Sequence, residues 1–352
     1  MNRAAIAVAS ALVVGAPNAY AWRETGHWAV CEIAYSNLSE PARTRLDGLV
    51  GEDFPRQCTW PDVVRNLPEW TSTRWWHFVD MPDATDYLSP GVLVRDADND
   101  GLDDGDVIRG ILFATDALNS PATSEELKRD WVRFLAHFVG DIHQPLHVGR
   151  PGDEGGNKIR VAWYGATQYL YPECVLATPG AAVCTTTVNK TKDVNLHMVW
   201  DYHVIDTFVR RLPVVPGDSE FRHKAYAQAV TRPLAPSTRT AITQTTPLDW
   251  MNESRLDRSV AYDVLTHENL QDTYAEKASV VINERIFLAG LRLAYLLNRV
   301  FDPQSIPPSE ELLRREEALR RQIGALNGWA PYERFRPEAS NPAPGVLVQP
   351  GL

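Results

Sequence analysis

The sequence contains two His-x-x-x-Asp pairs, His137 with Asp141 and His197 with Asp201. Residues four apart lie on the same face of an α-helix, so each pair would present an imidazole and a carboxylate side by side. One such pair alone is usually a surface ion pair or a buried histidine with satisfied hydrogen bonds. Here the first pair continues into a His-rich run that ends at His147. The pattern therefore indicates helices that carry metal ligands.

Hydrophobic periodicity predicts further helices along most of the chain. Ser39 and Asp106 stand where N-caps are expected, and Thr123 with Glu126 fits a capping box ahead of a long amphipathic segment. Pro145 should end that segment, because the residue before a proline disfavours the α region. The expected helices cover 26–37, 40–49, 107–118, 124–144, 193–208, 274–297 and a charged segment that is capped by Ser309 and stopped by Gly328.

A small β element is expected after the long helix. Residues 158–165 alternate apolar and polar side chains, which is typical of a strand, and a Thr-Pro-Gly turn separates Cys174 from Cys184. These two cysteines could bridge a hairpin, which would leave Cys31 with Cys58. Four cysteines allow three pairings, however, and the sequence does not choose among them. A zinc-thiolate site is the weaker alternative, because no Cys-x-x-Cys pair occurs.

The N-terminus has the features of a secretory signal peptide. Arg3 precedes an apolar run over residues 4–16, which is too short to span a bilayer, and Ala19-Tyr20-Ala21 fits the small-x-small cleavage rule. We expect cleavage after Ala21, a mature chain that starts at Trp22, and a secreted or periplasmic protein. A membrane anchor is the less favoured alternative. No later segment has eighteen consecutive apolar residues, so we expect no stable membrane association. We also expect a monomer.

The formal net charge of −10 limits how the protein could bind nucleic acid. A protein that holds duplex phosphates over a broad surface should be basic, because much of its affinity comes from lysine and arginine contacts to the backbone. A nucleic-acid partner would therefore have to be bound locally, for example through metal ions.

Five histidines and three aspartates stand at spacings that suit metal ligation. Neutral imidazoles and carboxylates are ligands that zinc prefers, and the number exceeds what one ion needs. Closely spaced ions are the usual arrangement for in-line attack on phosphorus, so two or three ions are expected. The eight candidates are His27, Asp62, His77, His137, Asp141, His147, His197 and Asp201.

These ligands fall in six motifs that follow one another along the chain. The motifs read W-R-E-T-G-H, D-V-V-R, W-H-F-V-D, H-F-V-G-D-I-H-Q-P-L-H, G-G-N and N-L-H-M-V-W-D, and they begin at Trp22, Asp62, Trp76, His137, Gly155 and Asn195. In this order they resemble the zinc-dependent single-strand nuclease and 3′-nucleotidase family, which shares its fold with zinc phospholipase C. Six ordered motifs are far more specific than one.

The resemblance covers residues 22–298. It implies a mainly α, phospholipase C/nuclease-type helical fold with a small β-hairpin and a trinuclear zinc cleft. Together with the change to Pro-rich composition after residue 301, it divides the chain into three parts. These are a signal peptide (1–21), a zinc-dependent nuclease domain (22–301), and a Pro-rich linker with a C-terminal helical extension (302–352).

The resemblance also assigns ligands to three zinc ions. Three ions against three carboxylates and a bridging hydroxide would leave the site at about +2, which is a local phosphate trap in an acidic protein. Asp141 would bridge the first two ions. The ligands would be Asp62, His77, His137 and Asp141 for the first ion, the α-amine and carbonyl of Trp22 with His27 and Asp141 for the second, and His147, His197 and Asp201 for the third.

Four further residues are assigned to the substrate by the same resemblance. Arg65, three residues after Asp62, would clamp a phosphate oxygen in the transition state. Phe78 would stack on an unpaired base, Asp80 would hydrogen-bond the base edge, and Asn157 would line the same site. The plainer alternatives are a surface ion pair for Arg65, core packing for Phe78 and a loop cap for Asp80.

An acidic loop with the sequence D-A-D-N-D-G resembles the first half of an EF-hand. Asp96, Asp98 and Asp100 stand at ligand positions 1, 3 and 5. Val107 stands at position twelve, where a bidentate glutamate is required. A solvated acidic loop therefore agrees with the sequence as well as a structural calcium site does.

The implied function is an exported phosphodiesterase that cleaves single-stranded RNA and DNA to 5′-phosphorylated products and removes the 3′-phosphate from nucleotides. One alternative is a phospholipase C on the same scaffold. The nuclease is favoured by the His-x-x-x-Asp pair of His197 and Asp201, because the phospholipase pattern resembles His-x-x-x-Glu at this place. The W-H-F-V-D motif favours it as well. A non-catalytic calcium-binding or adhesion module is the second alternative.

Overall fold

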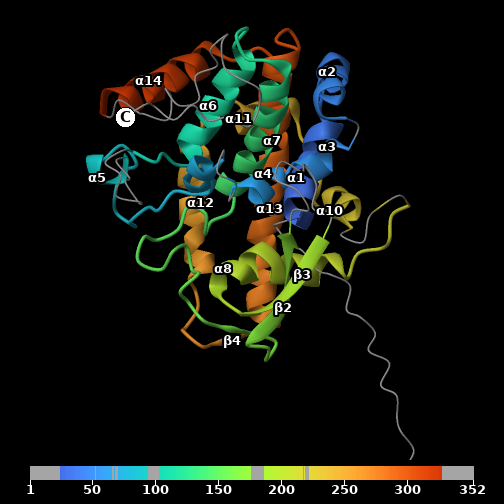
Figure 1. The fold of residues 1–352 in the computed structure, drawn as a ribbon, viewed down its shortest axis with the longest axis vertical. Coiled ribbons are helices and arrows are strands. Elements are labelled where there is room, and N and C mark those ends of the chain that lie inside the picture. The colour runs from blue at the N-terminus through green and yellow to red at the C-terminus, as the bar shows by residue number, and fades with distance from the viewer. Residues whose placement is uncertain are drawn as a thin grey trace, which may run out of the picture.

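The computed structural model describes residues 24–51, 53–65, 67, 70–93, 103–175, 186–216, 218 and 222–326. The predicted mainly helical fold with a small hairpin is confirmed (Figure 1). Several features that the sequence singled out lie outside the described residues. These are the signal peptide, Trp22, Cys184, Gly328 and the calcium-loop aspartates Asp96, Asp98 and Asp100.

Helix α13 (Asp272–Phe301) forms the spine of the molecule and is longer than the expected 274–297. Figure 1 shows it in orange through the middle, with α1 (Glu24–Ser36) and α7 (Glu125–Ile142) running beside it. Gly290 lets α1 approach closely, because an added Cβ there would lie 2.5 Å from the side chain of Ile33. The apolar core fills the space between these helices and α6 (Val107–Asn119).

The helix caps agree with the sequence at two positions and differ at a third. Ser39 accepts a hydrogen bond from the backbone N–H of Ala42 at the start of α2 (Glu40–Val50), and Asp106 caps α6. The capping box predicted at Thr123 is wrong. Ser124, with an extended backbone, caps α7 instead, while Thr123 is buried. The N–H of Thr123 bonds back to the carbonyl of Ser120 in the preceding turn, and the hydroxyl of Ser124 accepts from the N–H of Leu127, so the cap lies one residue later than predicted.

The long helix α7 ends at Ile142, two residues earlier than predicted. The next two N–H groups, of His143 and Gln144, bond back to Gly140 and Asp141 as a tightened turn before Pro145. This tight turn leads directly from the helix to His147. The position of Asp141 is therefore set by the helix, and that of His147 by the turn that follows it.

The expected helix over 193–208 begins later than predicted. Asp193 ends strand β3, and Asn195 caps the short helix α8 (Leu196–Met198) through a bond from the N–H of Met198. A π-helical segment η2 (Val199–His203) then leads into α9 (Val204–Val209). The side-chain oxygen of Asn195 accepts a hydrogen bond from a backbone N–H of the first turn, and this bond sets the residue at which the helix starts.

The hairpin is confirmed, whereas the preceding strand is shorter than expected. β2 (Gln168–Val175) and β3 (Thr186–Asp193) pair antiparallel. Within residues 158–165 only β1 (Ala162–Trp163) is a strand, and it pairs parallel with β4 (Asn269–Leu270). The residues before it turn instead, because the N–H of Ile159 bonds back to the carbonyl of Gly156.

One of the possible disulfides is present between Cys31 and Cys58. It joins α1 to the end of α3 (Phe54–Gln57). A bridge between Cys174 and Cys184 stays a prediction.

Aromatic packing anchors the short helices that follow the disulfide. Trp60 begins α4 (Trp60–Val64) and meets Phe134 of α7 edge to face, with ring centroids 5.4 Å apart. Trp76 lies in the 3₁₀ helix η1 (Thr71–His77) and stacks on Trp131 of α7 at 6.3 Å. These contacts hold α4 and η1 against α7, and so hold the predicted ligands that both carry.

The C-terminal helix α14 (Glu310–Leu326) packs on the body. Ser309 accepts a hydrogen bond from the N–H of Leu312, as predicted for its cap. Leu319 is buried in the common core, and Glu316 pairs with Arg299 of α13 at 2.7 Å. The proposed division of the chain at residue 301 stays a prediction.

Four further helices were expected only as part of a generally helical chain. They are α5 (Pro90–Leu93), α10 (His223–Val230), α11 (Pro236–Thr243) and α12 (Pro247–Ala261). In the described part of the chain, every helix is too short or too polar to cross a bilayer.

Candidate metal centre

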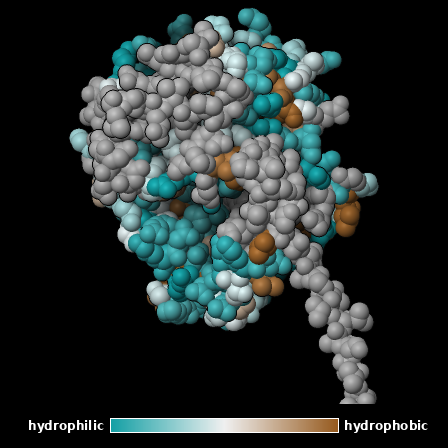
Figure 2. Space-filling view, in the orientation of Figure 1, coloured by the Kyte–Doolittle hydropathy of each residue, from teal (hydrophilic) through white to brown (hydrophobic). Residues whose placement is uncertain are grey.

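The eight predicted ligand residues converge on one cleft from six parts of the chain. His27 comes from α1, Asp62 from α4, His77 from the end of η1, and the other five from α7, its C-terminal turn and the α8–η2 segment. Seven of them, all but His137, line a cavity of about 650 Å³. Figure 2 shows mostly hydrophilic residues on the visible surface of the lower part of the molecule, over α8 and β4.

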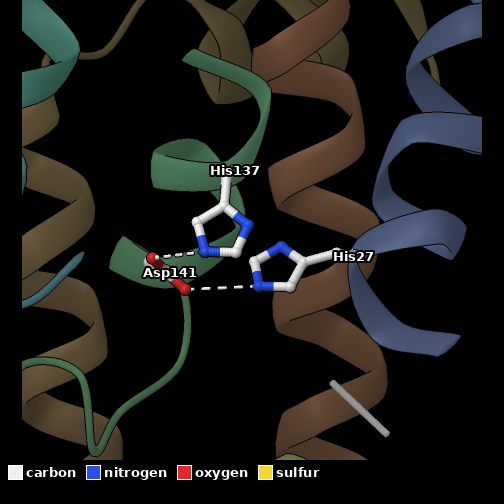
Figure 3. A group of neighbouring side chains, drawn as sticks. All are labelled: His27, His137 and Asp141. Atoms are coloured by element: carbon white, nitrogen blue, oxygen red, sulfur yellow. Dashed lines mark ion pairs between the residues drawn. The ribbon is translucent and has the colours of Figure 1, made fainter. Parts of the chain in front are cut away.

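Asp141 lies at the centre of the group and is only 1% exposed. Its Oδ1 is 3.3 Å from Nε2 of His27, and its Oδ2 is 3.2 Å from Nε2 of His137 (Figure 3). Nδ1 of His77 lies 3.0 Å from Oδ2, and Nδ1 of His147 lies 3.3 Å from Oδ1. Each carboxylate oxygen thus faces a different set of imidazoles, which is the arrangement that a bridging ligand needs.

Three sets of side chains bring their ligand atoms within 4.8 Å of one another, and each could hold a metal ion. His27, His137 and Asp141 form the first set. The second set includes Asp62, whose Oδ1 is 3.8 Å from Nε2 of His137. In the third set, Nε2 of His197 is 3.1 Å from Oδ2 of Asp201. The remaining members are His77 in the second set and His147 in the third.

Backbone carbonyls orient three of the imidazoles. Nδ1 of His137 lies 2.7 Å from the carbonyl of Cys58, Nδ1 of His147 lies 2.8 Å from that of His77, and Nδ1 of His197 lies 2.8 Å from that of Gly155. An N–H that donates to a carbonyl leaves Nε2 with its lone pair free for a metal, which is the usual outer shell of a histidine ligand. The Cys31–Cys58 disulfide ties one of these carbonyls to α1.

Burial keeps two of the imidazoles in the neutral form that binds metals. Burial, together with the nearby ring of His137, lowers the pKa of His27. Burial also lowers the pKa of His77 to about 4, although Asp141 opposes it. Nδ1 of His27 and Nε2 of His77 are buried with no hydrogen-bond partner among the described residues. Such orphaned nitrogens are costly unless something else in the site satisfies them.

The carboxylates of the cleft stay charged although they are buried. Burial by itself raises the pKa of Asp141, but His137 and His147 hold it well below its usual range. His197 and His147 do the same for Asp201. For His147, burial is outweighed by Asp141 and Asp201, which raise its pKa to about 9. Charged carboxylates at buried positions are stable only beside positive charge, such as a metal ion. Together with neutral imidazoles they form a donor set that fits zinc.

The predicted substrate residues line the same cleft, but their contacts differ. Nη1 of Arg65 pairs with Oδ1 of Asp62 at 3.0 Å, and the arginine side chain is 42% exposed. Phe78, Asp80 and Asn157 are also part of the cavity wall. The amide of Asn157 donates to the carbonyl of Glu154 at 2.9 Å, so it also supports its own turn. Their roles toward a substrate stay predictions.

Gln144 belongs to the site although the sequence analysis did not single it out. Its Nε2 donates to Oδ1 of Asp201 at 2.8 Å, and its side chain is buried. The sequence could have indicated this residue, because Gln144 lies inside the H-Q-P-L-H run of candidate ligands. Arg74 and Trp75 also line the cavity, and nothing in their local sequence distinguished them from ordinary surface residues.

Gly140 makes room for the ring of His27. A Cβ built on Gly140 would lie 2.4 Å from Nδ1 of His27. Gly140→Ala is therefore expected to displace this imidazole and to weaken metal binding by at least about tenfold, as disturbed ligand shells do, although alanine is the better helix former. Metal analysis of the purified variant and its turnover check this expectation.

Gly48→Ala is the matched control for this variant. Gly48 also lies inside a helix, α2, and nothing would lie within 4 Å of an added Cβ. This change should leave the metal content unchanged and raise the free energy of unfolding by up to about 1 kcal/mol. Full metal content in Gly140→Ala would show that His27 is not a ligand.

Comparisons with known proteins agree with the geometry of the cleft. The S1/P1 Nuclease family model matches residues 22–172 and 176–302. Endonuclease 3 of Arabidopsis thaliana is 29% identical over 315 residues, which cover 84% of this chain and 93% of the relative. Endonuclease 2 of the same plant is 28% identical over 306 residues, or 82% of this chain and 94% of the relative. Nuclease S1 of Aspergillus oryzae is 26% identical over 317 residues, which cover 83% of this chain and 96% of that protein.

Proposed function

Since this chain belongs to the S1/P1 nuclease family, we propose that it is a zinc-dependent endonuclease that cleaves single-stranded RNA and DNA to 5′-phosphorylated products. Membership makes it a nuclease, that is, a hydrolase of phosphodiester bonds. The proposal adds the metal, the strand preference and the product ends, together with removal of the 3′-phosphate from nucleotides.

The observation that carries the proposal is the convergence of five imidazoles and three carboxylates in one cleft. The three sets of ligand atoms and the shared position of Asp141 support three zinc ions, with Asp141 as a bridge. The proposed ligands are those that the family resemblance implies, including the α-amine of Trp22. Zinc, when bound, supplies a water of lowered pKa and positive charge that stabilises the phosphate and the leaving oxygen.

The side chains of this protein would position the substrate around that centre. Arg65 is held beside Asp62 and is exposed enough to reach a phosphate oxygen in the cleft. Phe78 follows His77 directly and Asp80 lies two residues further on, so a base stacked on Phe78 would place its phosphate near the ligands. Stacking accepts every base but requires it to be unpaired, which supports a preference for single strands.

Phe78→Ala tests the stacking role. Loss of a stacking platform costs about 1–3 kcal/mol per base, which corresponds to roughly a 5–150-fold rise in KM for oligonucleotides. Metal content should stay at the wild-type level. Steady-state kinetics on single-stranded DNA measures the effect.

Phe208→Ala is a suitable control, because Phe208 of α9 is also half-buried but packs on Tyr226 of α10 and does not line the cleft. It should lower thermal stability without changing KM. An unchanged KM in Phe78→Ala, with lowered thermal stability, would mean that Phe78 only packs.

Zinc counting combined with analysis of product ends tests the proposal as a whole. We expect three zinc ions per chain, cleavage of single-stranded RNA and DNA, and 5′-phosphate at every new end. Fewer than two zinc ions per chain, or 3′-phosphate at the new ends, would overturn it.

We also propose that the protein acts outside the cytoplasm as a monomer. The Ala19-Tyr20-Ala21 cleavage site and the Cys31–Cys58 disulfide support export, because disulfides persist in oxidising compartments. N-terminal sequencing of the exported protein should begin at Trp22.

A further inference from the structure

The 3₁₀ helix η1 carries a cation, Arg74, and an aromatic ring, Trp75, close to two residues of the site, His77 and Phe78. A 3₁₀ helix has three residues per turn, so side chains three apart are superposed along its axis, about 6 Å from one another. Arg74 therefore lies one turn before His77, the last residue of η1, and Trp75 lies three residues before Phe78, which follows the helix with an extended backbone. All four side chains line the cleft.

Arg74 is exposed, and the ring of Trp75 holds its guanidinium in place. The Cζ atom lies 4.4 Å from the centre of this ring, which is a cation–π contact. The centroid of the Trp75 ring is in turn 6.2 Å from that of Phe78. The guanidinium thus has a defined position on the wall of the cleft, next to the proposed base-stacking residue.

The charge of Arg74 is not neutralised in the way that two other cleft cations are. Arg65 pairs with Asp62 at 3.0 Å, and Lys158 pairs with Glu154 at 3.0 Å. No carboxylate among the described residues lies within ion-pair distance of Arg74. In a protein with a net charge of −10, an exposed, oriented and uncompensated guanidinium beside the metal centre is available to an anion.

We propose that Arg74, seated on Trp75, binds a second phosphate of the substrate strand, next to the one that is hydrolysed. This inference rests on the proposed function and specifies its substrate class: oligonucleotides bind through at least two phosphates. A nucleoside 3′-monophosphate or a dinucleoside monophosphate has only the phosphate that reacts. The contact therefore contributes nothing to these small substrates and strengthens the binding of longer strands.

Kinetics of Arg74→Gln on two substrates test this contact. Thymidylyl-thymidine has one phosphate, and its KM and kcat should be unchanged. For a long oligothymidylate, KM should rise and kcat should stay the same. Each phosphate contact to a single strand adds about 0.7 to the slope of log KM against log salt. The variant should lose this amount, so its KM defect should shrink by about 2.6-fold between roughly 50 and 200 mM salt.

Two further variants distinguish a phosphate contact from a structural effect. Arg74→Lys keeps the charge and should keep the salt slope. Arg56→Gln is the matched control, because Arg56 is also exposed and lies over a tryptophan, Trp28, at 5.6 Å, but does not line the cleft. It should behave like the wild type on both substrates.

The outcomes separate the two proposals. If the wild type cleaves neither substrate, the proposed function fails. If the wild type cleaves both, but Arg74→Gln has the wild-type salt slope on the oligonucleotide, the proposed function stands and the second phosphate site is wrong. An equal rise of KM on thymidylyl-thymidine would also overturn it, since Arg74 would then act on the reacting phosphate.

Discussion

Asp141→Asn is expected to abolish hydrolysis and to remove at least one metal ion. Both oxygens of Asp141 face imidazoles, His27 on one side and His137 on the other, and the residue is buried. An amide keeps the shape of the side chain but has one oxygen and no charge, so it cannot bridge two cations. Bound metal typically stabilises transition-state charge by several kcal/mol. Since 1.36 kcal/mol is a factor of ten, kcat should fall by at least about 10³-fold.

Asp130→Asn is a control on the same helix. Asp130 is buried as well, but it pairs with Arg133 at 3.1 Å and does not line the cleft. This variant should be less stable and should still bind the full complement of metal. Metal analysis beside turnover separates the two effects. Full zinc and wild-type kcat in Asp141→Asn would rule out the bridge.

One extra residue before Trp22 is expected to lower turnover about as strongly as Asp141→Asn does. A free α-amine has a pKa of roughly 7.7–8.0 and loses its proton readily beside a metal, whereas the nitrogen of a peptide bond is not such a ligand. His27, the proposed partner of this amine, is buried and faces Asp141 from α1. The extended protein should therefore lack the zinc that Trp22 and His27 share, and should lose most of its turnover.

Two forms of the mature chain test this expectation. One carries an extra glycine before Trp22, and the control carries the same glycine after Leu352. The control should contain the full zinc complement and should be fully active. Equal zinc and equal turnover in the two forms would show that the N-terminal amine is not a ligand, and would leave the processing site without a role in the chemistry.

Much of the metal centre could be predicted because its strongest signals are local. His137 with Asp141 and His197 with Asp201 are each four residues apart, and the caps Ser39 and Asp106 each bind N–H groups two or three residues away. Interactions over so short a range are set by residue type and spacing. The errors lie where a local pattern competed with packing. Thr123 fits a capping box, but its N–H closes a turn onto Ser120, and Ser124, one residue later, caps the helix.

The sequence by itself therefore determined the helical class, the two ligand pairs, and the presence of more ligands than one ion needs. Only the tertiary structure decided which distant residues meet: His27 with Asp141, Cys31 with Cys58, Gln144 with Asp201, and Arg74 on Trp75. The reason is physical. Spacing along one helix follows from its periodicity, but the approach of α1 to α7 depends on side-chain volumes across the whole core, down to the missing Cβ of Gly140.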